Sequence, residues 1–264
     1  MTGPSIEIED LCVDLGGRRV VDSASFAVVP GEIVGLVGAN GSGKTTLIRA
    51  ALGLARAVSG NARIGGSLAG DLTAAERASR VGYLPQERII GWNLPAWRVA
   101  ALGAPLRPPA ESRAEALIAL DLAGVAHLAD RRVLDLSGGE RAKILLARLL
   151  ATRAPFLIAD EPIAGLDPAA QLDTMDVLRA HAVQGGSVLA TLHDLGLTAS
   201  YCDRVVVMAT GRVIAVGPGD EVFTATVLDE GFGIKGEARS TLTRSTAAAP
   251  QRPSPPEPPA YRVS

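Results

Sequence analysis

Cysteines and long apolar runs are both scarce in this sequence of 264 residues. The two cysteines, Cys12 and Cys202, lie far apart among apolar neighbours, which is typical of small buried side chains in a reducing compartment rather than of a disulfide framework. No segment reaches the roughly 18 uninterrupted apolar residues that indicate a membrane-spanning helix. The N-terminus also lacks the charged and then apolar pattern of a secretion signal. We therefore expect a cytosolic chain that can act at a membrane only through partner subunits.

A strong charge of one sign is missing as well. The 26 Lys and Arg residues against 28 Asp and Glu residues give a net charge of −2, and the basic residues are scattered along the chain. Nucleic-acid binders usually carry a basic patch or stripe, so we expect no DNA or RNA partner. A composition of 47% hydrophobic and 20% charged residues instead indicates a globular protein with a core of its own.

What the sequence does contain is a phosphate-binding loop. The residues from Gly38 to Thr45 fit the pattern G-x-x-x-x-G-K-[ST], between an apolar run at 33–37 and a helical segment at 46–52. Its glycines allow backbone N–H groups to converge on phosphate oxygens, and the start of the following helix favours negative charge. We expect the nucleotide to contact Gly38, Ala39, Asn40, Gly41, Ser42, Gly43, Lys44, Thr45 and Thr46.

Two residues of this loop have side chains with chemistry of their own. Lys44 is expected to neutralise the β- and γ-phosphates of the nucleotide. Thr45 is expected to offer its hydroxyl to Mg²⁺, an ion that keeps most of its waters and takes few protein ligands. The alternative interpretation of the motif is an ordinary glycine-rich turn, which the flanking strand and helix disfavour.

A pair of carboxylates follows the second apolar strand. Asp160 and Glu161 come directly after the buried-type segment 156–159, and ligands of parallel α/β sheets bind at the carboxyl ends of the strands. Asp160 is therefore expected to hold Mg²⁺ through water, and Glu161 to orient and deprotonate an attacking water. A simple helix cap before Pro162 is the alternative.

A second anion site is indicated at Ser137, Gly138, Gly139 and Glu140. Ser137 and Glu140 have the spacing of a capping box, in which each side chain bonds the other residue's backbone N–H group. Capping does not explain the two glycines, which cost helix stability by about 1 kcal/mol each, so we expect something large to approach this helix start closely. Since the chain already has one phosphate-binding loop, this site is expected to serve the nucleotide of another copy.

The order of the segments predicts an α/β fold. Strand-like alternation between Ile6 and Val29, turning at Gly16–Gly17, predicts an N-terminal antiparallel β-layer, and the glycine-rich piece from Gly60 to Gly70 is expected to be rich in turns. Strands that alternate with helices imply a mainly parallel sheet. Helical signals over about 87–149 indicate an inserted α-helical subdomain.

The C-terminal segment has a different composition. Six prolines and little apolar content in the last 25 residues predict a disordered tail. We therefore expect one globular domain over residues 1–236 and a Pro-rich extension over 237–264.

Over residues 5–235 the sequence resembles the ATP-binding-cassette (ABC) ATPases. The family's landmarks occur in order: Walker A at Gly38 to Thr46, the Q-loop Gln86, the signature Leu136 to Glu140, Walker B ending at Asp160 with Glu161 after it, the D-loop Ala164 to Asp167, and the switch His193. The resemblance implies a P-loop NTPase (RecA-like) core that binds ATP and Mg²⁺, and a head-to-tail homodimer with each ATP between one chain's P-loop and the other's signature. It also implies that Gln86 contacts the metal or the water and that His193 binds the γ-phosphate. The remaining histidines, His127 and His181, are expected to be surface or packing residues.

Three departures from the family pattern involve four positions. Glu140 replaces the commoner Gln of the signature, and Ile163 and Ala164 stand where Thr and Ser are usual, which can alter contacts across the dimer. Leu15 occupies the position of the aromatic residue that stacks on adenine in the family. We therefore expect modest selectivity among nucleotides, with Arg18 or Arg19 as substitute stacking groups.

Local sequences resemble the ATPase subunits of importers for iron–siderophore complexes, haem and cobalamin, among them Val81 to Gln86, Trp92 to Pro95 and Tyr201 to Val205. This resemblance implies transmembrane permease subunits as partners, indirectly a substrate-binding protein, and a place at the cytoplasmic face of the membrane. Trp92 and Trp97 are expected either to face the permease's docking groove or to pack the helical subdomain. A zinc, manganese or other small-solute transporter, an exporter, and a non-transport ABC ATPase remain as alternatives.

Overall fold

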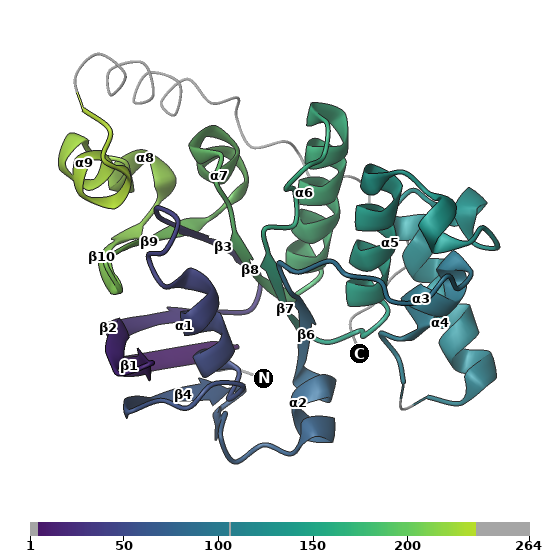
Figure 1. The fold of residues 1–264 in the computed structure, drawn as a ribbon, viewed down its shortest axis with the longest axis horizontal. Coiled ribbons are helices and arrows are strands. Elements are labelled where there is room, and N and C mark those ends of the chain that lie inside the picture. Colours follow the sequence, from purple (N-terminus) through teal and green to yellow (C-terminus); the bar gives the residue numbers. More distant parts are fainter. Residues whose placement is uncertain (1–4, 106, 236–264) are drawn as a thin grey trace.

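The computed structural model describes residues 5–105 and 107–235, and the proposed tail over 237–264 lies outside this part of the chain. Two sheets and the helices around them make up the fold (Figure 1). The strands are β1 (Ile6–Leu15), β2 (Arg18–Val28), β3 (Ile33–Val37), β4 (Ser59–Ile64), β5 (Ser67–Leu68), β6 (Val81–Leu84), β7 (Phe156–Asp160), β8 (Ser187–Thr191), β9 (Arg204–Ala209) and β10 (Arg212–Gly217). The helices are α1 (Lys44–Ala51), α2 (Ala74–Arg80), α3 (Ala96–Ala101), α4 (Pro109–Leu122), α5 (Gly138–Leu150), α6 (Pro168–Val183), α7 (Leu195–Tyr201), α8 (Gly219–Val222) and α9 (Ala225–Phe232), with short 3-10 turns η1 (Ala126–Leu128) and η2 (Val133–Asp135).

The larger sheet has the order β10-β9-β3-β8-β7-β6. Its neighbours pair in parallel except for β10, which returns antiparallel to β9. The smaller sheet is antiparallel and has the order β2-β1-β4-β5. The predicted α/β fold, with a mainly parallel sheet and an N-terminal antiparallel layer, is therefore confirmed.

The piece from Gly60 to Gly70 contains the expected turns at Gly65–Gly66 and Ala69–Gly70, but it also includes most of β4 and all of β5, two strands that were not predicted and that complete the antiparallel layer. The strand signal is weak since only Ala62 and Ile64 of β4 are buried. Gly60 adopts a φ of +76°, and a Cβ built on it would lie 2.2 Å from the backbone oxygen of Asp10. This glycine therefore permits β4 to approach β1 and does not end the strand.

Apolar packing divides between two regions. One cluster fills the space between the two sheets and around α1, with Phe156, Ile6 and Leu47 among its fully buried side chains. The other lies under α3–α6 and includes Leu120 and Ile144. The helices α3, α4 and α5 occupy the interval between β6 and β7, in which the sequence predicts the helical subdomain (Figure 1). Within the described residues, no helix has both the length and the apolar character needed to cross a membrane.

Candidate functional site

The register of the parallel sheet brings the chemical motifs to one edge. Leu36 of β3 pairs with Thr191 of β8, and Thr191 pairs in turn with Asp160 of β7. The phosphate-binding loop, His193 and Glu161 follow these three strands directly, and β6 beside β7 leads into Gln86. Residues up to 155 positions apart in the sequence therefore emerge side by side because parallel strands end at a common edge.

A cleft of about 380 Å³ opens at this edge of the sheet. Its lining includes most of the predicted phosphate-binding and catalytic residues together with Val20, and consists of Val20, Asn40, Gly41, Gly43, Lys44, Thr45, Thr46, Gln86, Glu161 and His193. Gly38, Ala39 and Ser42 belong to the same loop without lining the cleft. The predicted signature residues, Ser137 to Glu140, are not part of this lining.

The phosphate-binding loop is folded tightly around its lysine. Gly38 and Gly43 adopt positive φ angles, and a Cβ at either would lie within 2.7 Å of a backbone oxygen, that of Met208 or Val20 respectively. The buried Lys44 ammonium donates to the backbone oxygens of Gly38 (2.8 Å) and Ala39 (3.1 Å). Burial lowers the pKa of Lys44, and the negative charges of Glu161 and Asp160 act in the opposite direction.

Asp160 is held by two threonine hydroxyls. Thr45 Oγ1 donates to Asp160 Oδ2 at 2.9 Å, and Thr191 Oγ1 donates to Asp160 Oδ1 at 2.6 Å. The carboxylate is 1% exposed, so these bonds also satisfy a charge that water cannot reach. The Thr45 hydroxyl at the start of α1 and the Asp160 carboxylate at the end of β7 are adjacent hard oxygen donors, and this donor set fits Mg²⁺.

The carboxylate of Glu161 lies between two other predicted residues. Its Oε1 accepts a hydrogen bond from Gln86 Nε2 at 2.8 Å and lies 2.8 Å from His193 Nε2. Its backbone has a φ of +54°, a left-handed conformation that is strained for a residue other than glycine. Glu161 therefore joins Gln86 and His193, and all three line the cleft beside the phosphate-binding loop.

Two residues that the sequence left unassigned hold the backbone on either side of Glu161. The N–H group of Glu161 donates to Thr191 Oγ1 at 2.7 Å. The guanidinium of Arg88 donates to the backbone oxygen of Glu161 and, at 3.1 Å, to that of Ala164. The position of Thr191 at the end of a strand beside β7 could have predicted a contact with Glu161. Arg88 belongs to no motif, so no sequence pattern indicates its role.

The predicted capping box of α5 is confirmed. Ser137 accepts from the Glu140 backbone N–H at 3.2 Å, and the Glu140 carboxylate accepts from the Ser137 N–H at 2.7 Å. A Cβ built on Gly138 would meet nothing within 4 Å. Packing within the described residues therefore gives no reason for glycine at this position.

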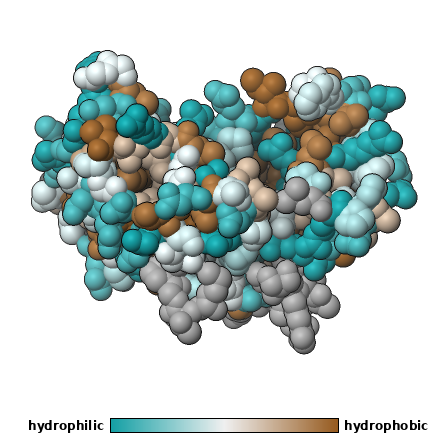
Figure 2. All heavy atoms as spheres, turned by 90° about the horizontal axis from the view of Figure 1, so that it is seen from below, coloured by the Kyte–Doolittle hydropathy of each residue, from teal (hydrophilic) through white to brown (hydrophobic). Residues whose placement is uncertain are grey.

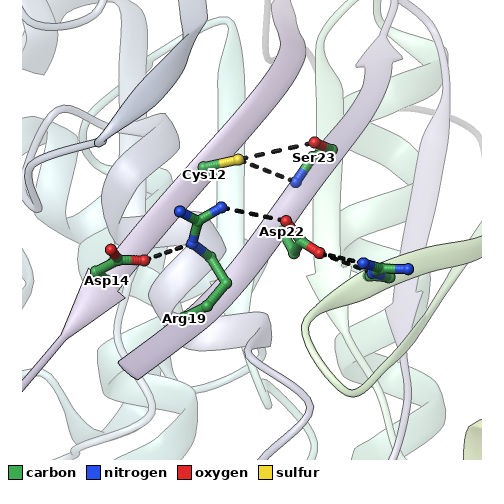
Figure 3. A network of polar contacts seen from close by, with 6 residues as sticks. Cys12, Asp14, Arg19, Asp22 and Ser23 are labelled. Atoms are coloured by element: carbon green, nitrogen blue, oxygen red, sulfur yellow. Dashed lines mark hydrogen bonds and ion pairs between the residues drawn. The ribbon is translucent and has the colours of Figure 1, made fainter. Parts of the chain in front are cut away.

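The hairpin where the family carries an adenine-stacking ring contains an ion-pair network (Figure 3). Arg19 binds Asp14 at 2.5 Å and Asp22 at 3.2 Å, and Asp22 also binds Arg212 of β10 at 2.6 Å. Arg19 can stack on a base only by leaving both carboxylates, so Arg18, the other predicted stacking group, is the better candidate. Leu15, at the tip of the same hairpin, is half exposed.

The two tryptophans of the helical region differ in environment. Trp97 packs against the core, and its ring centroid lies 5.3 Å from the guanidinium of Arg98 and 5.1 Å from that of Arg113, whereas Trp92 is 69% exposed. The packing alternative therefore holds for Trp97, and a docking role for Trp92 stays a prediction. Figure 2 shows apolar surface on the side of the molecule where α3 and α4 lie in Figure 1.

Comparison with known proteins agrees with this geometry. A family model described as "ABC transporter" matches residues 21–164. The chain is 37% identical to the hemin import ATP-binding protein HmuV of Rhodococcus jostii (strain RHA1), over 94% of this chain and 87% of that protein. It is also 37% identical to the cobalamin import ATP-binding protein BtuD of Halobacterium salinarum (strain ATCC 29341 / DSM 671 / R1), over 86% of this chain and 58% of that one. Among solved structures, cbiO1 of Clostridium perfringens, part of the ABC transporter complex cbiONQ, superposes with a TM-score of 0.74 at 27% identity, covering 85% and 92% of the two chains.

Proposed function

Because the chain belongs to the ABC transporter family, as one of its ATP-hydrolysing subunits, we propose that it powers the import of a metal chelate of the haem, iron–siderophore or cobalamin kind. The observation that carries the enzymatic part is the meeting of Lys44, Gln86, Glu161 and His193 at one cleft. The proposal for the cargo rests on the relatives, whose printed names refer to hemin and cobalamin import.

In the proposed reaction Glu161 is the general base. Its Oε1 already bonds Gln86 and faces His193, while Oε2 bonds none of the described residues and can accept a proton. The water oxygen forms a bond to the γ-phosphorus as the bond from that phosphorus to the β–γ bridging oxygen breaks. ADP leaves with the bonding electrons, and the proton of the water passes to Glu161 and then to the released phosphate.

Lys44 and the glycine-lined loop bind the transferred phosphate. Backbone N–H groups at the start of α1 and the Lys44 ammonium offset the negative charge of the phosphate oxygens. Thr45 and Asp160 are the residues that would hold Mg²⁺, with Gln86 nearby on the adjoining strand end. When bound, the ion would neutralise charge that develops on the β- and γ-phosphate oxygens. His193 is 2.8 Å from Glu161 and would contact the γ-phosphate from the same side.

A second copy of the chain would complete each site. Ser137, Gly138, Gly139 and Glu140 form a helix start that is exposed or partly exposed and lies outside the cleft lining, and no contact within the described residues demands the glycines there. In a head-to-tail homodimer this helix start would close over the triphosphate bound to the opposite chain. Both nucleotides would then lie between the two subunits.

The membrane partners would be permease subunits, fed by a substrate-binding protein. The exposed Ile89 and Trp92 follow Gln86 directly, so a permease helix that docks on them would lie one short segment away from Glu161. The protein would then act at the cytoplasmic face of the membrane without entering it. Co-purification from the native host with a multi-span membrane protein, and loss of growth on haem or another chelate after deletion of the gene, would support this assignment. Co-purification with ribosomes or DNA alone would contradict it.

The catalytic assignment is tested by two substitutions. Glu161→Gln keeps the shape of the side chain but cannot accept the proton, so we expect nucleotide affinity to be retained and turnover to fall by about 10²–10⁴. Lys44→Ala is expected to weaken ATP binding itself, which equilibrium binding of a fluorescent ATP analogue would measure. Unchanged turnover of the Glu161 variant would show that another residue is the base. Unchanged ATP affinity of the Lys44 variant would show that Lys44 does not bind the nucleotide.

A further inference from the structure

Arg88 contacts the loop that follows β7 and carries Glu161. It lies two residues after Gln86, and its guanidinium donates to the backbone oxygens of Glu161 and Ala164. The Ala164 N–H group also donates to the Glu161 oxygen at 3.2 Å, which closes the segment 161–164 into a turn. Arg88 therefore bonds both ends of this turn.

Glu161, whose carbonyl oxygen Arg88 bonds, has a strained backbone conformation. Glu161 has a φ of +54°, and left-handed conformations at residues other than glycine persist only where surrounding contacts fix them. Thr191 accepts from the N–H group on one side of this residue, and Arg88 donates to its carbonyl on the other. With both peptide groups fixed, the Cβ of Glu161 is aimed at Gln86 and His193.

Stability alone does not account for an arginine at this position. Arg88 is half buried, and burial lowers the pKa of its guanidinium, while the charge of Glu161 acts in the opposite direction. Within the described residues its hydrogen bonds go to carbonyl oxygens, and it forms no ion pair with a carboxylate. Desolvating a cation without a direct counter-ion is costly, so an uncharged side chain would fill the space at a lower free energy.

We propose that Arg88 is a positioning residue for hydrolysis, which holds the Glu161–Ala164 turn so that the Glu161 carboxylate meets the attacking water. This inference rests on the proposed role of Glu161 as the base. Arg88 is not itself part of the cleft lining, and among the described residues its hydrogen bonds go to the backbone oxygens of Glu161 and Ala164 rather than to the phosphate-binding loop. Its loss should therefore affect the chemical step and leave ATP binding unchanged.

The test uses the purified full-length chain with Arg88→Met, which keeps the length of the side chain but has no donors. We expect kcat to fall by about 10- to 100-fold, the effect of misplacing a catalytic group by about an ångström, with KM and ATP affinity within about twofold. Arg88→Lys, which keeps the charge and the donors but lacks the planar fork of the guanidinium, should recover part of the lost kcat. An unchanged kcat, or a loss that appears only as weaker ATP binding, would overturn the proposal.

Arg77 of α2 provides the matched control. It also donates to two backbone oxygens, those of Ala69 and Leu72, at 3.1 Å each, and it lies outside the nucleotide cleft. Arg77→Met should lower the melting temperature at least as much as Arg88→Met but leave kcat within about twofold. Equal losses of kcat in the two variants would show that the Arg88 substitution acts through lower overall stability and not through the position of Glu161.

A double substitution separates this inference from the function on which it rests. If Arg88 acts through Glu161, adding Arg88→Met to Glu161→Gln should lower the remaining turnover by less than about twofold, because the base that it positions is already absent. A further loss as large as in the wild-type background would refute the positioning role while leaving the base assignment intact. Full turnover of Glu161→Gln alone would overturn the base assignment, and this inference with it.

Discussion

Burial sets the protonation behaviour of individual side chains in this protein, and His181 shows it most clearly. The ring is 3% exposed, its Nε2 lies 3.3 Å from the Pro155 carbonyl oxygen, and its Nδ1 is buried without a partner in the described residues. Desolvation of the charged form lowers the pKa of His181 to about 4. His181 is therefore a packing residue, which is one of the two roles expected for it from the sequence.

This burial predicts a pH dependence of stability. Between pH 6.5 and about 4 the unfolded chain binds a proton at His181 that the folded chain does not, so the free energy of unfolding falls as the pH is lowered through this window. The full difference is about 3 kcal/mol for this group. Urea unfolding at pH 7.5 and pH 5 should show about 2 kcal/mol of this difference, since pH 5 lies within the window, and His181→Gln should reduce the pH dependence. The exposed His127 provides the control, since His127→Gln should leave the slope unchanged; an equal slope in all three proteins would contradict the prediction.

The helix α5 combines a local stabilising device with residues that no local contact explains. Its capping box satisfies N–H groups within the chain, whereas Gly138 faces open space. Gly138→Ala should therefore keep the free energy of unfolding or raise it by up to about 1 kcal/mol, since alanine is the better helix former. Turnover should nevertheless fall about tenfold or more, because the added methyl group would meet the triphosphate of the opposite subunit.

Gly70→Ala is the control for this prediction, since a Cβ at Gly70 also meets nothing within 4 Å and no function is proposed for it. Steady-state ATP hydrolysis gives the turnover of both variants, and urea unfolding gives their free energy of unfolding. Normal turnover of Gly138→Ala would show that nothing approaches this helix start during the reaction.

The elements found from the sequence are those with local signals. Ser137 and Glu140 are three residues apart, and the phosphate-binding loop occupies eight consecutive positions, so their structure follows from short-range geometry. The strand β4 was missed because it buries only Ala62 and Ile64 and contains Gly60. The contacts of Glu161 with Thr191 and Arg88 join residues 30 and 73 positions apart, and depend on a strand register that no local pattern encodes.

For the whole molecule, the decisive expectation is ATP-dependent pairing of two chains. Glu161→Gln with Mg²⁺ and ATP should sediment as a dimer, because bound triphosphate that is not cleaved would keep the two subunits together. The same protein with ADP should sediment as a monomer, since the γ-phosphate joins each loop to the opposite signature. Adding Gly139→Arg to the Glu161→Gln chain should prevent dimer formation, since a bulky side chain would fill the gap that the triphosphate needs. Monomers under all three conditions would contradict the head-to-tail arrangement.

The left-handed backbone of Glu161 also bears on how this protein responds to laboratory evolution. Asparagine and glycine tolerate such a φ better than glutamate does, by an amount on the order of 1 kcal/mol. A library screened for heat resistance alone would therefore enrich these residues at position 161. The selected variants would be more stable but would have lost ATP hydrolysis. Selection for thermostable variants must accordingly assay turnover in the same round.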